Sequence, residues 1–304
     1  MKKEQTPDMQ PIVSLGAGVQ STAMCLMAAK GLIKPMPKAA IFADTQAEVG
    51  YKTLGNKKGE REGLYKWLDW LEDELPFPVY TVTRGDLTKA SLTPSYIQKE
   101  GCKLPVGSSY LRKLIPVFGE LMEDGKARRT AALGRKCTSD YKIVPVHRLT
   151  KEICGVKRGQ KEATVSMWLG ISYDELTRMR EPRHKWLEHR WPLIEMEMSR
   201  SGCIKWMLDN GYPEPPRSAC YYCPFHSDRE WAKLKADDPE HFDDAVKFDK
   251  DLRAAFKEHD SLTKMTVYLH SSCKPLDEIE LRKSSDPNQL ELSMLDECEG
   301  MCGI

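Results

Sequence analysis

The first third of the chain alternates short apolar segments with longer amphipathic ones, and this alternation restricts the fold more than any other feature. Helical spacing of apolar residues predicts helices over 20–30 and 61–75. Apolar runs that predict buried strands lie at 11–15, 39–43, 78–83 and 163–170. Strands and helices in this order form a parallel sheet with crossover helices. The sequence therefore predicts an α/β fold with an open, doubly wound, mostly parallel sheet.

The pattern changes near residue 192. Beyond it, the sequence predicts helices over 201–210 and 228–256, with a loop rich in proline and cysteine between them. A chain of 304 residues is long enough for one large domain or two modest ones. We therefore expect an α/β domain over residues 1–191 and a cysteine-rich helical region over 192–304.

Charge and hydropathy exclude several classes of protein. The 46 Lys and Arg residues balance 45 Asp and Glu residues, which excludes a polycation that coats nucleic acid and leaves only a local basic face, between residues 142 and 190. No apolar stretch reaches the roughly 18–20 residues of a membrane span, and residues 1–10 lack the apolar core of a signal peptide. We therefore expect a cytoplasmic protein with no membrane partner. In that reducing compartment, ten cysteines point to metal binding or redox chemistry rather than to disulfides.

A glycine-containing loop lies between the first predicted strand and the first predicted helix. Glycines let the backbone approach a ligand, and the N-terminus of the helix offers N–H groups to an anion. The loop lacks the Gly-Lys-[Ser/Thr] of a Walker A motif and the third glycine of the dinucleotide fingerprint. It is either an ordinary strand–helix turn or a phosphate site, and in the second case these residues line it: Ser14, Gly16, Gly18, Gln20, Ser21 and Thr22.

This loop resembles the PP-loop of the adenine-nucleotide alpha-hydrolase superfamily, which usually has the form Ser-Gly-Gly-x-Asp-Ser. Gln20 stands where ATP pyrophosphatases carry Asp, and phosphoadenosine phosphosulfate (PAPS) reductases tend to have Gln there. Segments 41–48, 135–145 and 168–178 resemble, in the expected order, the family's Asp-Thr-Gly-x-Glu strand end, its Arg-x-Cys…Lys-x-x-Pro element and its Glu-Ser-x-x-Arg stretch. The chain is therefore similar to the PAPS reductase-like family. The resemblance implies that residues 1–191 form a PP-loop, HUP-like nucleotide-binding domain.

The resemblance also implies how an adenine nucleotide binds. Asp44 and Thr45 would flank the adenosine, and Gly170 would lie beside the nucleotide. The remaining implied ligands neutralise its anionic group: Arg135, Lys142 and Arg178. The nucleotide would be PAPS, adenosine phosphosulfate (APS), or ATP with Mg²⁺.

Cys220 and Cys223 form a Cys-x-x-Cys motif in the loop before residue 228. Two thiolates at this spacing can bind one metal centre, and the motif also serves dithiol redox chemistry. Cys137 and Cys203 would complete four ligands, for an iron–sulfur cluster or for structural zinc. The resemblance favours a 4Fe–4S cluster, because cluster-containing sulfonucleotide reductases hold it with a cysteine pair after the Arg element and a downstream Cys-x-x-Cys.

The last nine residues contain Cys298 and Cys302 beside acidic residues and glycines. The tail is similar to the Glu-Cys-Gly-[Leu/Ile] tail of sulfonucleotide reductases, in which the cysteine attacks sulfate sulfur. The resemblance thus implies a thiol-dependent reductase with one tail cysteine as nucleophile, the other as resolving thiol, and a thioredoxin-like reductant as partner. Two alternatives remain: an ATP-dependent sulfurtransferase that thiolates tRNA or DNA, with a cysteine desulfurase as partner, and a non-enzymatic iron–sulfur nucleotide sensor. The oligomeric state is not predicted.

Overall fold

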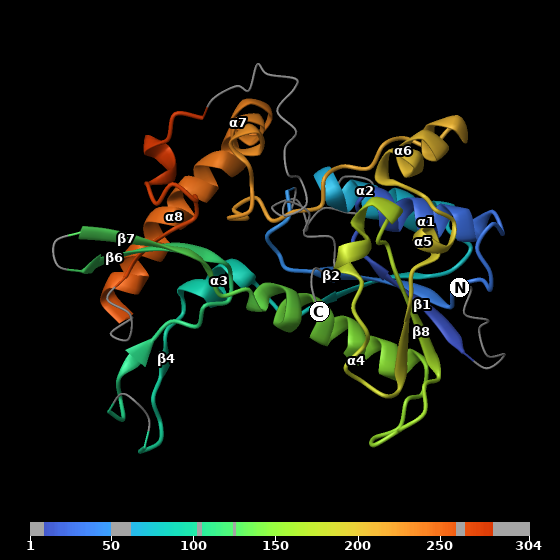
Figure 1. Ribbon diagram of the computed structural model, residues 1–304, viewed down its shortest axis with the longest axis horizontal. Helices are drawn as coiled ribbons and strands as arrows, with labels where there is room; N and C mark the ends of the chain where they lie inside the picture. Colours follow the sequence, from blue (N-terminus) through green and yellow to red (C-terminus); the bar gives the residue numbers. More distant parts are fainter. Residues whose placement is uncertain (1–8, 50–61, 102–104, 124–125, 260–264, 282–304) are drawn as a thin grey trace.

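A computed structural model describes residues 9–49, 62–101, 105–123, 126–259 and 265–281 (Figure 1). Its centre is a five-stranded sheet in the order β3-β2-β1-β8-β9, and every neighbouring pair is parallel. The strands are β1 (Gln10–Leu15), β2 (Ala39–Asp44), β3 (Val79–Thr83), β8 (Val165–Leu169) and β9 (Leu187–Arg190). The prediction of an α/β fold with a mostly parallel sheet is confirmed.

Helices cover both faces of this sheet because side chains of successive strand residues point to opposite faces. Val13 and Leu15 pack in one core with α1 (Val19–Ala29) and α2 (Gly63–Glu74). Ile12 packs in a second core on the other face, where α4 (Val144–Ile153) contributes Val146. β1 and β2 are buried along almost their whole length, as strands covered on both sides must be.

Two short helices after β9 extend the α1 side of the sheet. They are α5 (Pro192–Glu195) and α6 (Arg200–Asp209), and Figure 1 shows α6 beside α1 and α2. Leu193, Cys203 and Met207 belong to the same core as α1. Segments beyond residue 192 thus complete the core that begins with β1.

A third core lies beside the central sheet. An antiparallel sheet of β6 (Val117–Glu123), β7 (Lys126–Leu133) and β10 (Thr266–Tyr268) packs with the long helix α8 (Pro239–His259). α7 (Asp228–Asp237), α3 (Leu87–Leu92) and a hairpin of β4 (Ser95–Tyr96) and β5 (Ser109–Tyr110) complete this part. Figure 1 shows it on the opposite side of the molecule from α6.

The structure differs from the sequence-based expectation at several places. The predicted helix over 228–256 is two helices, because Asp238 leaves the helical conformation and Pro239 starts α8 in the first-turn position that proline tolerates. A π-helical turn, Cys137–Ile143, precedes α4, and a 3₁₀ segment, Tyr173–Arg178, follows β8. A second 3₁₀ turn spans Leu276–Glu278. None of the helices in the described residues is both long enough and apolar enough to cross a membrane.

Candidate functional site

The glycine loop lies where the strand order reverses. From β1 the chain goes to β2 and β3 on one side, and later to β8 and β9 on the other. Open α/β sheets bind ligands at the carboxyl ends of the strands at such a point. Gly18 is the N-cap residue of α1, in an extended conformation (φ −91°, ψ −171°) and with no side chain to cap the helix. The N–H groups of the first turn therefore point to a position where an anion can bind.

Ala17, between the two glycines, carries the unusual backbone conformation of the loop. Its φ of 59° lies in the left-handed region, whereas neither Gly16 nor Gly18 has a positive φ. A non-glycine residue pays steric strain there, and such strain is concentrated at functional sites. The strained residue is thus at the tip of the predicted phosphate loop.

Gly170 brings the end of β8 against the first turn of α1. A Cβ at this position would lie 2.7 Å from the backbone nitrogen of Ser21 and 2.8 Å from its Cα. Only glycine allows the backbone after β8 to approach the first turn of α1 this closely. Ser172, two residues further, is fully buried, and its Oγ makes no hydrogen bond to any residue that the structure describes.

The hydroxyls of the first turn of α1 are engaged inside the protein. Ser21 Oγ lies 3.4 Å from the carbonyl oxygen of Gly18. The indole N–H of Trp67, on α2, donates to Thr22 Oγ1 at 3.4 Å. Ser21 remains adjacent to the loop, and Thr22 faces α2.

Gln20 is held at both ends of its amide. Its Nε2 donates to Glu175 Oε2 at 3.4 Å, and its Oε1 accepts from Arg200 Nη1 at 3.1 Å. Glu175 in turn pairs with Arg178, with 2.5 Å between Oε1 and Nη1. Arg200 begins α6 and is a site residue that the sequence analysis missed. Its only local signal was its place after Ser199, which caps α6.

Asp44 ends β2 and Thr45 follows it, at the same edge of the sheet. Asp44 is buried, and its Oδ1 accepts from the hydroxyl of Tyr65 and from the backbone N–H of Gln46, both at 2.8 Å. Burial raises the pKa of the Asp44 carboxyl, while these hydrogen bonds and the Lys142 ammonium act in the opposite direction. Tyr65 lies on α2 and no sequence pattern marked it.

Lys142 lies between the glycine loop and a buried carboxylate. With Ser14 and Gly16 it lines a cavity of about 10 Å³ between the ends of β1 and β2. Its Nζ is 3.8 Å from Glu48 Oε1, and both side chains are almost inaccessible to solvent. Lys142 thus lies within reach of the glycine loop, and the cavity between them has room for about one water molecule. Glu48, its buried partner, belongs to the motif at 41–48 but was not predicted as a site residue.

The Cys-x-x-Cys loop packs against the same strand end. Cys220 Sγ lies 3.3 Å from Thr45 Oγ1, the backbone of Cys220 bridges to Glu48, and Tyr221 N donates to Ala47 O at 2.9 Å. Burial and then the Glu48 carboxylate raise the pKa of the Cys220 thiol. The structure thus brings the cysteine loop next to the predicted adenosine contacts.

The predicted metal ligands are only partly brought together. Cys137 and Cys220 pack against the third core. Burial raises the pKa of Tyr222, and the thiolate forms of Cys220 and Cys137 raise it further. Cys203 instead packs in the core beside α1. Within the described ranges, no group of three or more His, Cys, Asp or Glu side chains is arranged to hold a metal ion. The thiols of Cys137, Cys220 and Cys223 fit a cluster or zinc by donor type, and the four-ligand set stays a prediction.

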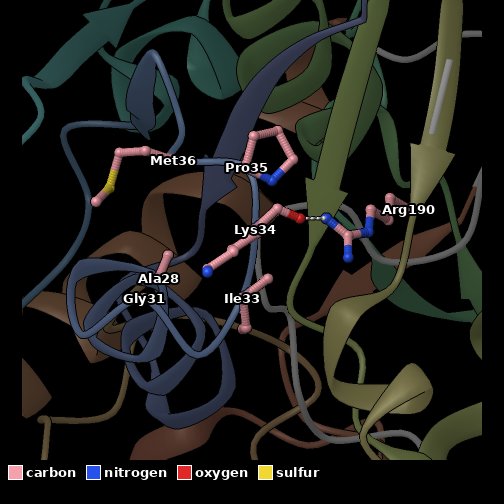
Figure 2. Close-up of a pocket in the computed structure, with 7 residues that line it drawn as sticks. All are labelled: Ala28, Gly31, Ile33, Lys34, Pro35, Met36 and Arg190. Atoms are coloured by element: carbon pink, nitrogen blue, oxygen red, sulfur yellow. Dashed lines mark hydrogen bonds between the residues drawn. The ribbon is translucent and has the colours of Figure 1, made fainter. Parts of the chain in front are cut away.

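Of the remaining predicted residues, the structure describes Arg135 alone. Arg135 is exposed, and its guanidinium lies 5.2 Å from the ring centroid of Phe225, beside the cysteine loop. Cys298 and Cys302 lie outside the described residues. A shallow cavity of about 610 Å³ lies at the C-terminal end of α1, where Arg190 donates to the Lys34 carbonyl at 2.7 Å (Figure 2). This cavity is at the end of the helix away from the glycine loop and shares no residue with the candidate site.

No protein-family model matches the chain, and no curated protein matches its sequence.

Proposed function

We propose that the chain is a PP-loop enzyme of the PAPS reductase-like family, which binds a sulfonucleotide at the strand-order reversal and reduces it with thiols. One observation carries this proposal. The glycine loop at the end of β1 and the Cys-x-x-Cys loop packed on Thr45 meet at the carboxyl edge of adjacent strands. An anionic nucleotide and sulfur chemistry would thus share one site.

The side chains at this edge have separate roles in the proposal. The first turn of α1 and the Lys142 ammonium would hold the sulfate or phosphate, because both supply positive charge in a site with little water. Asp44 and Thr45 would position the adenosine. Arg178, held against Glu175, would approach the same anion from the β8 side.

Gln20 favours a sulfonucleotide over ATP with Mg²⁺. Mg²⁺ takes oxygen ligands, preferably carboxylates. The side chain next to the loop is an amide, and its single oxygen already accepts a hydrogen bond from Arg200. A sulfonucleotide transfers its sulfonate group to a thiol and needs no such ligand for a metal.

The reaction would use two thiols, and the resemblance assigns them to Cys298 and Cys302. One thiolate attacks the sulfur atom of the sulfonucleotide. An S–S bond forms, the bond from sulfur to the bridging phosphate oxygen breaks, and the nucleoside phosphate leaves. The second thiolate attacks the sulfonated cysteine, so that a disulfide forms and sulfite departs. The two thiols together lose two electrons, which sulfur gains, and a thioredoxin-like dithiol then reduces the disulfide.

Cys137, Cys220 and Cys223 would hold a 4Fe–4S cluster or zinc in this proposal. Bound there, a cluster or zinc would cross-link the cysteine loop to the π-helical turn beside the nucleotide. The chain's own contribution is to keep the Cys220 thiol against Thr45.

Anaerobically purified protein tests the proposal. We expect sulfite release from PAPS or APS that requires an added dithiol, and none from the Lys142→Met variant. ATP, with and without tRNA, is the matched control. Conversion of ATP to AMP only in the presence of nucleic acid would assign the protein to the sulfurtransferases instead. Nucleotide binding without turnover of any of these compounds would make it a sensor.

A further inference from the structure

Four polar side chains form a continuous chain of hydrogen bonds between α6 and the 3₁₀ segment that follows β8. Arg200 Nη1 donates to Gln20 Oε1 at 3.1 Å, and Gln20 Nε2 donates to Glu175 Oε2 at 3.4 Å. The other oxygen of this carboxylate, Glu175 Oε1, accepts from Arg178 Nη1 at 2.5 Å. A guanidinium group thus stands at each end of the chain, and one carboxylate lies between them.

Gln20 brings this carboxylate to the start of α1. It is the second residue of the helix, after Val19, and its side chain is fully buried. Arg200 occupies the amide oxygen, so the amide nitrogen is the end that meets Glu175. An N–H donor at the first turn of a helix is a group that an anion at the glycine loop would use. In the structure, the Glu175 carboxylate uses it.

Arg178 is the second donor that Glu175 engages. The side chains of Arg178 and Glu175 are 17% and 19% exposed, so most of the pair is shielded from water. A shielded ion pair is screened little by salt and holds its partners together. Arg178 is also the guanidinium that the proposed function assigns to the anion of the substrate. One internal carboxylate therefore engages two donors that the substrate would need.

The segment that carries Glu175 is held less firmly than the strand before it. Tyr173–Arg178 is 3₁₀-helical and contains no buried residue, and Glu175 itself leaves the helical conformation at φ −117° and ψ 26°. Ser172, the N-cap residue, makes no capping hydrogen bond from its side chain. Segments with few buried contacts open at low cost in free energy. The break at Glu175 lets its side chain turn away while Gly170 stays packed on Ser21.

Other groups hold the start of this segment against α6. Tyr173 N donates to Met198 O at 2.8 Å, and Asp174 Oδ1 accepts from Arg200 N at 3.1 Å. Neither contact involves the Glu175 side chain. The Glu175 carboxylate can therefore leave Arg178 without any movement of α6.

We propose that Glu175 is an internal competitor of the substrate's anion, and that its carboxylate occupies Arg178 and the Gln20 amide until the anion displaces it. Arg178 then passes from the carboxylate to the sulfate or phosphate. If Glu175 holds Arg178 for about nine tenths of the time, the apparent affinity for the anion is about tenfold below the intrinsic one. The inference rests on the proposed function only in taking the glycine loop as an anion site.

This exchange favours one class of anion. An anion with a single charge replaces the carboxylate at Arg178 and gains little. Two adjacent anionic groups, as in a sulfonucleotide or in pyrophosphate, also reach the N–H groups and the positive dipole end of α1. Glu175 thus disfavours small carboxylates at the loop relative to the nucleotide.

Calorimetry with inorganic pyrophosphate as the probe tests the competition. Glu175→Gln keeps the shape of the side chain and removes its charge, so that pyrophosphate affinity should rise about tenfold. Excess acetate should weaken pyrophosphate binding in this variant and leave the wild type unaffected. Asp174→Asn is the matched control, because it removes the same charge one residue away, where the carboxylate accepts from the Arg200 backbone. Its affinity should rise about twofold at most, since an exposed charge is screened.

A double-variant cycle with Arg178 shows whether the competition runs through this guanidinium. The gain from Glu175→Gln should disappear when the same change is made in Arg178→Met, because no donor is then released. Urea unfolding of each variant verifies that the fold is kept.

Three results would overturn the proposal. A loss of pyrophosphate affinity in Glu175→Gln would make Glu175 a positioning residue for Arg178. An equal gain in Asp174→Asn would reduce the effect to net charge. A wild type and a Glu175→Gln variant that both fail to bind pyrophosphate would leave nothing to compete for. The reductase fails separately: a tenfold gain that depends on Arg178, in a protein that releases no sulfite from PAPS or APS, would keep this role of Glu175 and refute the proposed reaction.

Discussion

The ion pair of Lys142 and Glu48 makes a prediction whose size follows from its geometry. The Lys142 Nζ is 3.8 Å from Glu48 Oε1, and the side chains are 5% and 1% exposed. At an effective dielectric constant of about 20, two unit charges at this separation attract by about 4 kcal/mol. Removing one partner of a buried pair typically costs about 3–5 kcal/mol, because the other charge stays buried without it.

Lys142→Met should therefore destabilise the protein by about 3–5 kcal/mol. It leaves Glu48 beside Asp44, whose carboxyl pKa Lys142 helps to keep down. Glu48→Gln should cost less, because Lys142 still faces Asp44 and the amide keeps the shape of the side chain. The double variant Lys142→Met/Glu48→Leu should recover much of the loss, since an apolar pair of similar volume often replaces a buried ion pair without penalty.

Urea unfolding at pH 7 of the wild type, the two single variants and the double variant measures the coupling directly. A cost below about 1 kcal/mol for Lys142→Met would show that the pair is solvated and would refute the reasoning from burial. Nucleotide binding distinguishes the role of Lys142 from that of Glu48. Calorimetry should show nucleotide affinity lost in Lys142→Met and retained in Glu48→Gln, because only Lys142 lines the cavity beside the glycine loop.

Three other outcomes are expected. Gly170→Ala should lower the free energy of unfolding by about 1–3 kcal/mol and abolish nucleotide binding, because the methyl group forces the first turn of α1 away from β8. In the control variant Gly31→Ala, the new Cβ meets no atom within 4 Å. Strain at its φ of +73° should lower stability there while nucleotide binding persists. Burial, then the nearby histidines and Lys151, lower the pKa of His147 to about 4. Its contribution to stability, about 3 kcal/mol, is thus complete above pH 6.5 and lost as the pH falls from there to 4, so that His147→Gln should flatten an unfolding profile over that window. Incubation with a sulfonucleotide should give a sulfonated adduct, seen by mass spectrometry, in the serine variant of the resolving thiol and none in that of the nucleophile; identical behaviour of Cys298→Ser and Cys302→Ser would contradict separate roles.

Local patterns were sufficient to predict four of the five strands of the central sheet, and β9 (Leu187–Arg190) was not predicted. Runs such as 39–43 are apolar throughout, because a strand that is covered on both faces needs apolar side chains on both. The period and length of these runs identified them as strands. The glycine loop was predicted for the same reason, because it lies between a recognisable strand and a recognisable helix. The antiparallel sheet was not predicted. Its strand β6 pairs with β10, about 150 positions later, and no local pattern encodes that partner.

The phosphate loop shows a limit of another kind. Sequence patterns associate unusual backbone conformations with glycine, but here the left-handed residue is Ala17 and both flanking glycines are free of it. Ala17 adopts its strained conformation because the strand and the helix on either side are fixed by the core. The packing of β1 and α1 therefore determines a conformation that the local sequence disfavours.

The contacts of Gln20 explain why the position of the candidate site could be predicted from the sequence, whereas the full set of its residues could not. Gln20 meets Glu175 and Arg200, which are 155 and 180 positions away. Parallel topology brings the carboxyl ends of β1 and β8 together, so any motif that follows either strand must lie at this edge. Arg200 follows no strand; it reaches Gln20 because α6 packs against α1 through Cys203 and Met207. When only helix packing brings a residue to a site, the local sequence around it does not show that it belongs there. For this reason the helices that pack on α1, as well as the strand ends, determine what can bind at the loop.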